Sequence, residues 1–203
     1  MSHDDYSYFT QFSLPQHLHI DLAALEKTFY AQSRKLHPDR FASQSPEAQQ
    51  AALAASSQLN DAYRTLRDPI LRTEYLLSLQ GIQLEEQSRA ATDLAKASGT
   101  QKKQIAPPDL LEEAFELNMA LEEIKMGGDD PDARNELETA RTKFTAMLSE
   151  TQQQLESLWT QWDAAVDTNN ETAKESAKQS MVALLNRRSY IRNLVRDVNA
   201  ALE

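Results

Sequence analysis

Apolar residues recur along this chain at intervals of three and four, and no stretch alternates between apolar and polar residues as a half-buried β-strand does. Intervals of three and four place side chains on one face of an α-helix, so each such stretch predicts an amphipathic helix. Only four glycines occur in the 203 residues, which disfavours sheet-rich folds with many tight turns. The sequence therefore predicts an all-α fold.

The composition excludes several classes of protein. The absence of cysteine rules out a disulfide scaffold, Cys-ligated zinc or iron–sulfur sites and a cysteine nucleophile. The net charge of −10 argues against nucleic acid as a partner, because phosphate binding needs a clustered positive surface. No apolar run approaches the roughly 18 residues of a membrane span, so we expect no membrane partner. The N-terminus shows no export signal, which predicts the cytoplasm of a bacterium, or the mitochondrial matrix if a transit peptide is missing from this sequence.

Glycine and proline divide the chain into three parts. Residues 1–81 form a first region with helical periodicity. Residues 82–108 are polar and end in two prolines, which predicts a linker with one short helix within Leu84–Ala97. Residues 109–203 return to helical periodicity and hold most of the negative charge, which predicts a C-terminal helical bundle.

Two helices are predicted in the first region. Asp21 is a typical N-cap, and Pro38 stops the helix that follows it. The apolar stripe of this helix comprises Leu22, Leu25, Phe29 and Leu36. The second helix runs from about Ala48 to Leu66. A loop of about ten residues joins the two, which predicts an antiparallel helical hairpin.

The loop of this hairpin carries the tripeptide His37-Pro38-Asp39. Taken alone, the tripeptide fits an ordinary turn, in which proline restricts φ and aspartate caps the backbone. Its surroundings are unusual because the preceding helix has a basic outer face. Lys27 and Arg34 lie within about 20° of each other on that helix, nearly opposite the apolar stripe, and Arg40 follows the loop directly. The pattern predicts an exposed polar tip beside a basic surface.

The first region resembles a J-domain, the module that stimulates the ATPase of an Hsp70 chaperone. The matching segments are Tyr8-Phe9, Leu14-Pro15, Arg34–Phe41, Leu59–Leu66 and Asp68-Pro69, with Arg72 and Tyr75 after them. Arg40 stands where the family usually has lysine, which preserves the positive charge. The resemblance implies an Hsp70-binding site that comprises His37, Pro38, Asp39, Lys27, Arg34, Lys35 and Arg40. The chain itself then needs no catalytic residue, because the ATP chemistry takes place in the partner.

The helix after Pro108 has two apolar faces. Its core stripe comprises Leu110, Ala114, Leu117, Leu121 and Ile124. A second set lies about 100–180° away and comprises Leu111, Phe115 and Met119, bordered by Glu112, Glu116 and Glu123. An outward apolar strip edged by carboxylates indicates a protein-binding surface. The alternative is that another helix covers the strip.

Two further helices complete the predicted bundle, with breaks at residues 127–131 and near residues 167–170. The buried side of the middle helix comprises Leu137, Ala140, Phe144, Leu148, Leu155, Leu158 and Trp162. The core stripe of the last helix comprises Met181, Leu184, Ile191, Val195, Val198 and Leu202. Tyr190 points nearly opposite that stripe, and an exposed tyrosine is a common interface anchor. Trp159 is expected to pack within the bundle.

The order of J-domain, connection and acidic three-helix bundle is similar to that of the HscB/Jac1 family of co-chaperones. The resemblance implies that the chain binds an iron–sulfur scaffold protein of the IscU type, delivers it to a specialised Hsp70 of the HscA type and stimulates that ATPase. The implied client-binding site comprises Leu111, Phe115, Glu116, Met119, Glu123 and Tyr190. Met119 stands where the family usually has an acidic residue. No cofactor is implied.

Alternatives stay open at this point. The chain could be a J-domain co-chaperone for a different client, or a purely structural helical protein. A hydrolase or metal enzyme that uses His37 and Asp39 would need further Glu or His groups near residue 38, and none is evident. His17 and His19 precede a helix and are more typical of solvated loop residues than of metal ligands, so we expect no metal site.

Overall fold

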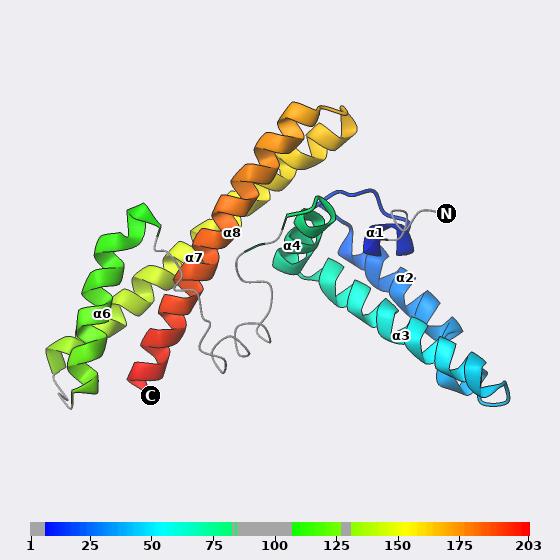
Figure 1. The fold of residues 1–203 in the computed structure, drawn as a ribbon, viewed down its shortest axis with the longest axis horizontal. Helices are drawn as coiled ribbons and strands as arrows, with labels where there is room; N and C mark the ends of the chain where they lie inside the picture. The colour runs from blue at the N-terminus through cyan, green and yellow to red at the C-terminus, as the bar shows by residue number, and fades with distance from the viewer. Residues whose placement is uncertain (1–6, 83, 85–106, 127–130) are drawn as a thin grey trace. The chain divides into compact units, whose positions relative to one another are not determined.

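The computed structural model describes residues 7–82, 84, 107–126 and 131–203. Within these residues all regular structure is helical, which confirms the all-α prediction (Figure 1). Most of the expected linker over 82–108, with its short helix within Leu84–Ala97, lies outside the described residues. None of the described helices is long and apolar enough to cross a membrane.

The chain divides into two compact units, each assembled from segments far apart in sequence. The first unit comprises Met1–Ile82 and Trp159–Lys178, and the second comprises Gln83–Leu158 and Gln179–Glu203. The two longest helices, α7 (Pro131–Asp167) and α8 (Glu171–Leu202), therefore contribute to both units.

The N-terminal segment of the first unit consists of short helices around a hairpin. Its elements are α1 (Tyr8–Gln11), α2 (Leu22–Lys35), the 3₁₀ turn η2 (Pro38–Arg40), α3 (Pro46–Arg67) and α4 (Pro69–Leu79). Helices α2 and α3 lie side by side as an antiparallel pair (Figure 1). The predicted hairpin is thus present.

The ends of these helices follow from local side chains. Asp21 caps α2, because its carboxylate accepts hydrogen bonds from the backbone N–H groups of Ala23 and Ala24, at 2.9 and 3.0 Å. Ser45 caps α3 and Asp68 caps α4, each directly before a proline in the first helical position. Side chains next to the first turn therefore set where α2, α3 and α4 begin.

The core of this segment is apolar and lies between the hairpin, α1 and α4. Its buried residues are Phe9, Phe12, Leu18, Leu25, Ala52, Leu59, Ala62, Leu66, Leu76 and Leu77. The stripe predicted for α2 is only partly buried: Leu25 is 1% exposed, whereas Leu22 is 50% exposed. Phe29 is half-buried and stacks on Tyr63 of α3, with ring centroids 4.2 Å apart.

The remainder of the first unit is the tip of the α7–α8 hairpin, which docks through its tryptophans. Trp159 donates a hydrogen bond from Nε1 to Thr73 Oγ1, and Trp162 donates one to the backbone oxygen of Gln16, both at 2.9 Å. The guanidinium of Arg72 lies 5.1 Å above the Trp159 ring. The expectation that both tryptophans pack within the three-helix bundle is wrong, because their buried N–H groups find acceptors on α4 and on the loop before α2.

The same tip holds the two histidines of that loop. His17 Nε2 lies 3.0 Å from Asp167 Oδ1, and His19 Nδ1 lies 2.9 Å from Asp163 Oδ2. Asp163 also accepts hydrogen bonds from the backbone N–H groups of Leu18 and His19, at 2.7 and 2.9 Å. The sequence predicts solvated loop residues here, whereas the structure pairs both histidines with carboxylates of α7. They pair with carboxylates that lie almost 150 residues away in the chain.

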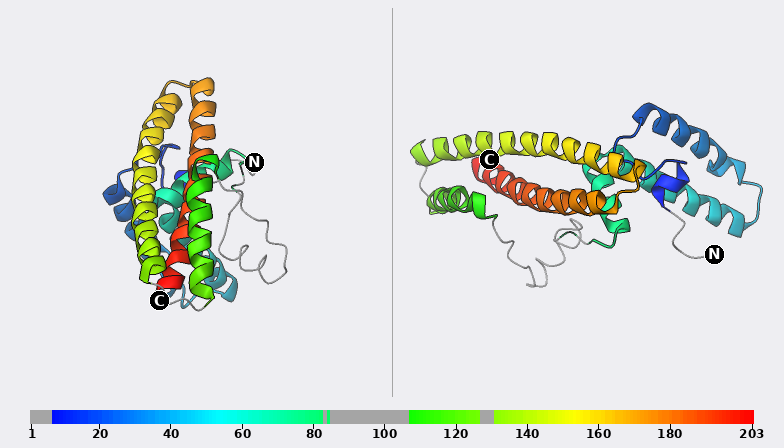
Figure 2. Two further views of the ribbon diagram at one scale, coloured as in Figure 1. Left: turned by 90° about the vertical axis from the view of Figure 1, so that its left-hand side faces the viewer. Right: turned by 90° about the horizontal axis from the view of Figure 1, so that it is seen from above.

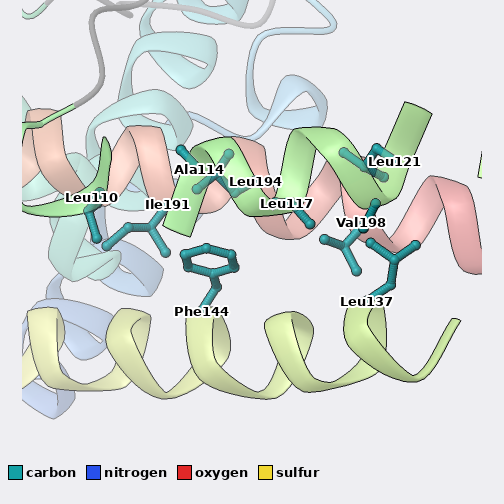
Figure 3. Packing of buried hydrophobic residues seen from close by; sticks show 10 residues of the cluster. Leu110, Ala114, Leu117, Leu121, Leu137, Phe144, Ile191, Leu194 and Val198 are labelled. Carbon is teal, nitrogen blue, oxygen red and sulfur yellow. The ribbon is translucent and has the colours of Figure 1, made fainter. Parts of the chain in front are cut away.

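The second unit is the predicted bundle of α6 (Leu111–Lys125), α7 and α8, with the 3₁₀ turn η3 (Pro108–Leu110) before α6. Figure 2 shows the three helices side by side. Phe144 of α7 is 1% exposed and points toward α6 and α8 (Figure 3). Around it lie Leu110, Ala114, Leu117, Ala120, Leu121, Leu137, Ile191, Leu194 and Val198. The predicted core stripe of α6 is confirmed, apart from Ile124, which is only partly buried.

Candidate functional site

The tripeptide at the hairpin tip forms a compact turn. His37 precedes η2, and Pro38 occupies its first position. The backbone N–H of Asp39 donates a hydrogen bond to His37 Nδ1 at 3.3 Å, and the same Nδ1 lies 3.4 Å from Asp39 Oδ2. The side chains of His37 and Asp39 are 58% and 88% exposed. The turn thus presents an imidazole and a carboxylate together to solvent, close to a restricted proline.

The basic residues predicted to flank this tip are all exposed. They are Lys27, Arg34, Lys35 and Arg40. None of them forms an ion pair with a carboxylate in the part of the chain that the structure describes. Arg34 and Lys35 lie in the last turn of α2, immediately before the tripeptide. Their positive charge is therefore available to an acidic partner surface.

Sequence reasoning missed an aromatic residue on the same surface. Tyr30 is 54% exposed and lies three residues after Lys27 and four before Arg34, which places it between them on one helix face. Its ring is tilted against Phe29, with centroids 5.4 Å apart. Its position could have identified it, because residues three after Lys27 and four before Arg34 lie on the same face of a helix as these two basic residues.

The second candidate surface is the outer strip of α6. Leu111, Phe115 and Met119 are 56%, 66% and 59% exposed, so no described helix covers them. Glu116 and Glu123 beside them are exposed as well. The structure therefore confirms an outward apolar strip with acidic neighbours. This excludes the alternative of a second buried face.

Tyr190 differs from its prediction. It is partly buried and packs against the bundle core, and this burial raises the pKa of its hydroxyl above the usual value. The predicted stripe of α8 omitted Leu194, which is buried. Leu194 lies four residues after Tyr190, so the two side chains are on the same face of the helix. The core face of α8 is thus wider at this point than the stripe implied. A role for Tyr190 in client binding stays a prediction.

A groove between α6 and α7 runs beside the strip and encloses about 550 Å³. Its lining includes Glu116, Met119 and Glu123 of α6 and Glu136 of α7. At one side Lys143 Nζ lies 3.2 Å from Glu113 Oε1. Glu113 has its pKa lowered, first by a hydrogen bond from its own backbone N–H and second by the bond from Lys143. The charged residues of the groove lining are thus four glutamates and one lysine, among apolar and neutral polar neighbours.

Among the described residues no group of three or more His, Asp or Glu side chains could hold a metal ion. His37 and Asp39 have no further histidine or carboxylate as an ion-pair or hydrogen-bond partner in the described part of the chain. The arrangement suits recognition of a partner protein by an exposed turn.

Comparison with known proteins gives a consistent result for both parts of the chain. Residues 106–198 match a family model described as the HSCB C-terminal oligomerisation domain. The solved structure of the chaperone HscB from Vibrio cholerae is similar, with 29% sequence identity, a TM-score of 0.59 and coverage of 96% of each chain. The C-terminal part of the chain is thus similar to the HscB family, and nearly the whole chain is similar to an HscB structure. Human co-chaperone protein HscB, at 23% identity, shares the fold, with a TM-score of 0.54 and coverage of 97% of this chain and 82% of the human one.

The match to the Vibrio cholerae chaperone covers nearly the whole chain, whereas the family model covers its C-terminal part alone.

Proposed function

We propose that this chain is a co-chaperone of iron–sulfur cluster assembly that joins two partner proteins. Through the tip at His37-Pro38-Asp39 it stimulates the ATPase of a specialised Hsp70 of the HscA type. Through the strip at Leu111, Phe115 and Met119 it binds a scaffold protein of the IscU type and delivers it to that Hsp70. The observation that carries the proposal is the exposed tripeptide beside a basic helix face that no described carboxylate pairs with, in a chain that is similar to HscB.

The physical role of the basic face is to guide the encounter. Lys27, Arg34 and Lys35 are exposed and unpaired with any described carboxylate, so they attract an acidic surface from a distance. Such attraction raises the association rate more than the final affinity and falls as salt screens it. The tripeptide then acts at short range, where its restricted backbone presents the imidazole and the carboxylate in one arrangement.

The Hsp70 half of the proposal is tested by His37→Gln. We expect this variant to lose stimulation of the cognate Hsp70 ATPase in steady-state turnover and to keep its melting temperature, because the side chain is 58% exposed and outside the core. The matched control is His17→Gln, which removes another histidine of the same unit. It should stimulate like the wild type. Full stimulation by His37→Gln would refute this half.

The client half is tested by the double variant Leu111→Ala/Phe115→Ala. Both side chains are more than half exposed, so the variant should fold normally. Loss of two apolar anchors at the centre of an interface should weaken binding of the cognate scaffold by at least about tenfold. Titration calorimetry measures this. A large drop in melting temperature with unchanged affinity would show that the two side chains serve the fold. Unchanged affinity together with an unchanged melting temperature would equally refute this half.

A further inference from the structure

The outward face of α6 carries one more apolar residue beyond those that the sequence singled out, on the far side of the exposed Glu122. Met126 is 86% exposed, more than any other exposed large apolar residue described. Its backbone N–H donates a hydrogen bond to the oxygen of Glu122 at 3.0 Å, so the helical path extends to this residue. It lies seven positions after Met119, which places both on nearly the same face. The strip from Leu111 to Met126 is therefore about 22 Å long at 1.5 Å per residue, and the carboxylate of Glu122 interrupts its apolar surface between the two methionines.

The strip is charged differently along its two sides. On the side next to Met119, the carboxylates of Glu116 and Glu123 line the groove toward α7, where Glu136 adds a third. None of these three carboxylates forms an ion pair with a basic residue that the structure describes. On the other side lies Asn118, whose amide donates a hydrogen bond to the backbone oxygen of Ala114 at 2.7 Å. Unpaired negative charge thus accumulates on the groove side.

We infer that the client occupies the whole strip out to Met126 together with the adjoining groove, through an apolar element about 22 Å long that carries Lys or Arg side chains along the side facing α7. This inference rests on the proposed client-binding function and adds the extent of the surface and the chemistry of the partner. It also assigns a role in binding to Glu136, which lies on a different helix from the strip.

Two physical arguments favour this occupant. Methionine side chains are flexible and polarisable, and they suit surfaces that adapt to an apolar partner. Met119 and Met126 therefore extend the strip without the shape demands of branched side chains. Unpaired carboxylates around a groove gain most from cationic partner groups and oppose a second acidic surface. With its net charge of −10, another copy of this chain suits the groove less well than a basic segment of a client.

The extent of the strip is tested by Met126→Ala. We expect the affinity for the cognate IscU-type scaffold, measured by titration calorimetry with the full chain, to fall by about five- to tenfold. The matched control is Leu53→Ala on α3, because Leu53 is also a large exposed apolar residue, at 64%. It should bind like the wild type. Wild-type affinity for Met126→Ala would overturn the extension to this residue.

The role of the groove is tested by Glu136→Lys. This charge reversal should lower the affinity for the scaffold by at least about tenfold at low salt. Added salt should reduce the difference in affinity between the variant and the wild type. The matched control is Glu138→Lys, the same change two residues later on α7, at an exposed residue outside the groove lining. If both reversals have the same effect, general charge explains it and the inference fails.

The outcomes distinguish this inference from the proposed client-binding function on which it rests. If Leu111→Ala/Phe115→Ala lowers the affinity for the scaffold but Met126→Ala and Glu136→Lys do not, the proposed client site is supported and the extended surface is refuted. If the double variant has no effect, the proposed client site itself fails. Sedimentation that shows self-association sensitive to Met126→Ala, with unchanged scaffold binding, would identify a second copy as the occupant and overturn the inference.

Discussion

Replacement of Asp163 should weaken the docking of the α7–α8 tip on the N-terminal segment. Its carboxylate is 15% exposed and accepts two backbone hydrogen bonds, from Leu18 at 2.7 Å and from His19 at 2.9 Å. Leu18 is fully buried, whereas the bond from His19 lies at an exposed position where water can replace the carboxylate. Asp163→Ala therefore removes the acceptor of one buried N–H group and of one exposed N–H group.

The magnitude follows from the burial of these bonds. A hydrogen bond to a charged group stabilises a protein by about 1.5–3 kcal/mol, so the loss of the bond from Leu18 costs about that much, and the exposed bond from His19 adds less. In a protein of this size, a loss of about 2–3 kcal/mol lowers the melting temperature by about 4–12 °C. Asp163→Asn keeps one acceptor oxygen and should lose about half as much.

Thermal and urea unfolding, followed by circular dichroism, measure both variants. Asp167→Ala is the matched control one turn later on α7. Its carboxylate is 66% exposed and pairs with His17, so its loss should change the free energy of unfolding by less than about 1 kcal/mol. If Asp163→Ala is no less stable than this control, the backbone hydrogen bonds do not contribute as argued.

Two further variants test the packing and the electrostatics of the bundle. Phe144→Ala should lower the free energy of unfolding by about 3–5 kcal/mol in urea titrations, because this ring is 1% exposed at the centre of the bundle core; a loss under about 1 kcal/mol would contradict that packing. Because the pKa of Glu113 is lowered in the folded chain, its ionised form contributes stability above its unfolded pKa, and this contribution is lost as the pH falls through the folded value. Lys143→Met should move the pKa of Glu113 partway back toward its ordinary value in a carboxyl NMR titration, and an unmoved titration curve would show that Lys143 has no part in the shift.

The helices and their boundaries were largely predictable, because their signals are local. Asp21 and Pro38 delimit α2 through hydrogen bonding and backbone restriction within a few residues. The break near residues 167–170 separates α7 from α8, and residue Asn169 there has a positive φ of 50°. The two faces of α6 were predictable as well, because helical periodicity alone separates a buried stripe from an outward one.

Predictions failed where a distant segment decides the environment of a residue. Trp159 and Trp162 have the spacing of bundle residues, yet their partners are Thr73 and Gln16. Tyr190 was expected to be exposed, but neighbouring helices half-cover it. No local pattern in the sequence indicates which surface covers a given helix face.

The order of residues alone determined the helical class, the helix ends, the polar tip with its basic face and the apolar strip of α6, because each depends on neighbours within a few turns. Tertiary packing decided that the tip of the α7–α8 hairpin joins the N-terminal unit, that Asp163 bonds the loop before α2, and that α7 supplies one wall of the acidic groove. These features join residues separated by up to about 150 positions. Such pairings arise from the burial and hydrogen bonding of whole surfaces, which local periodicity does not encode.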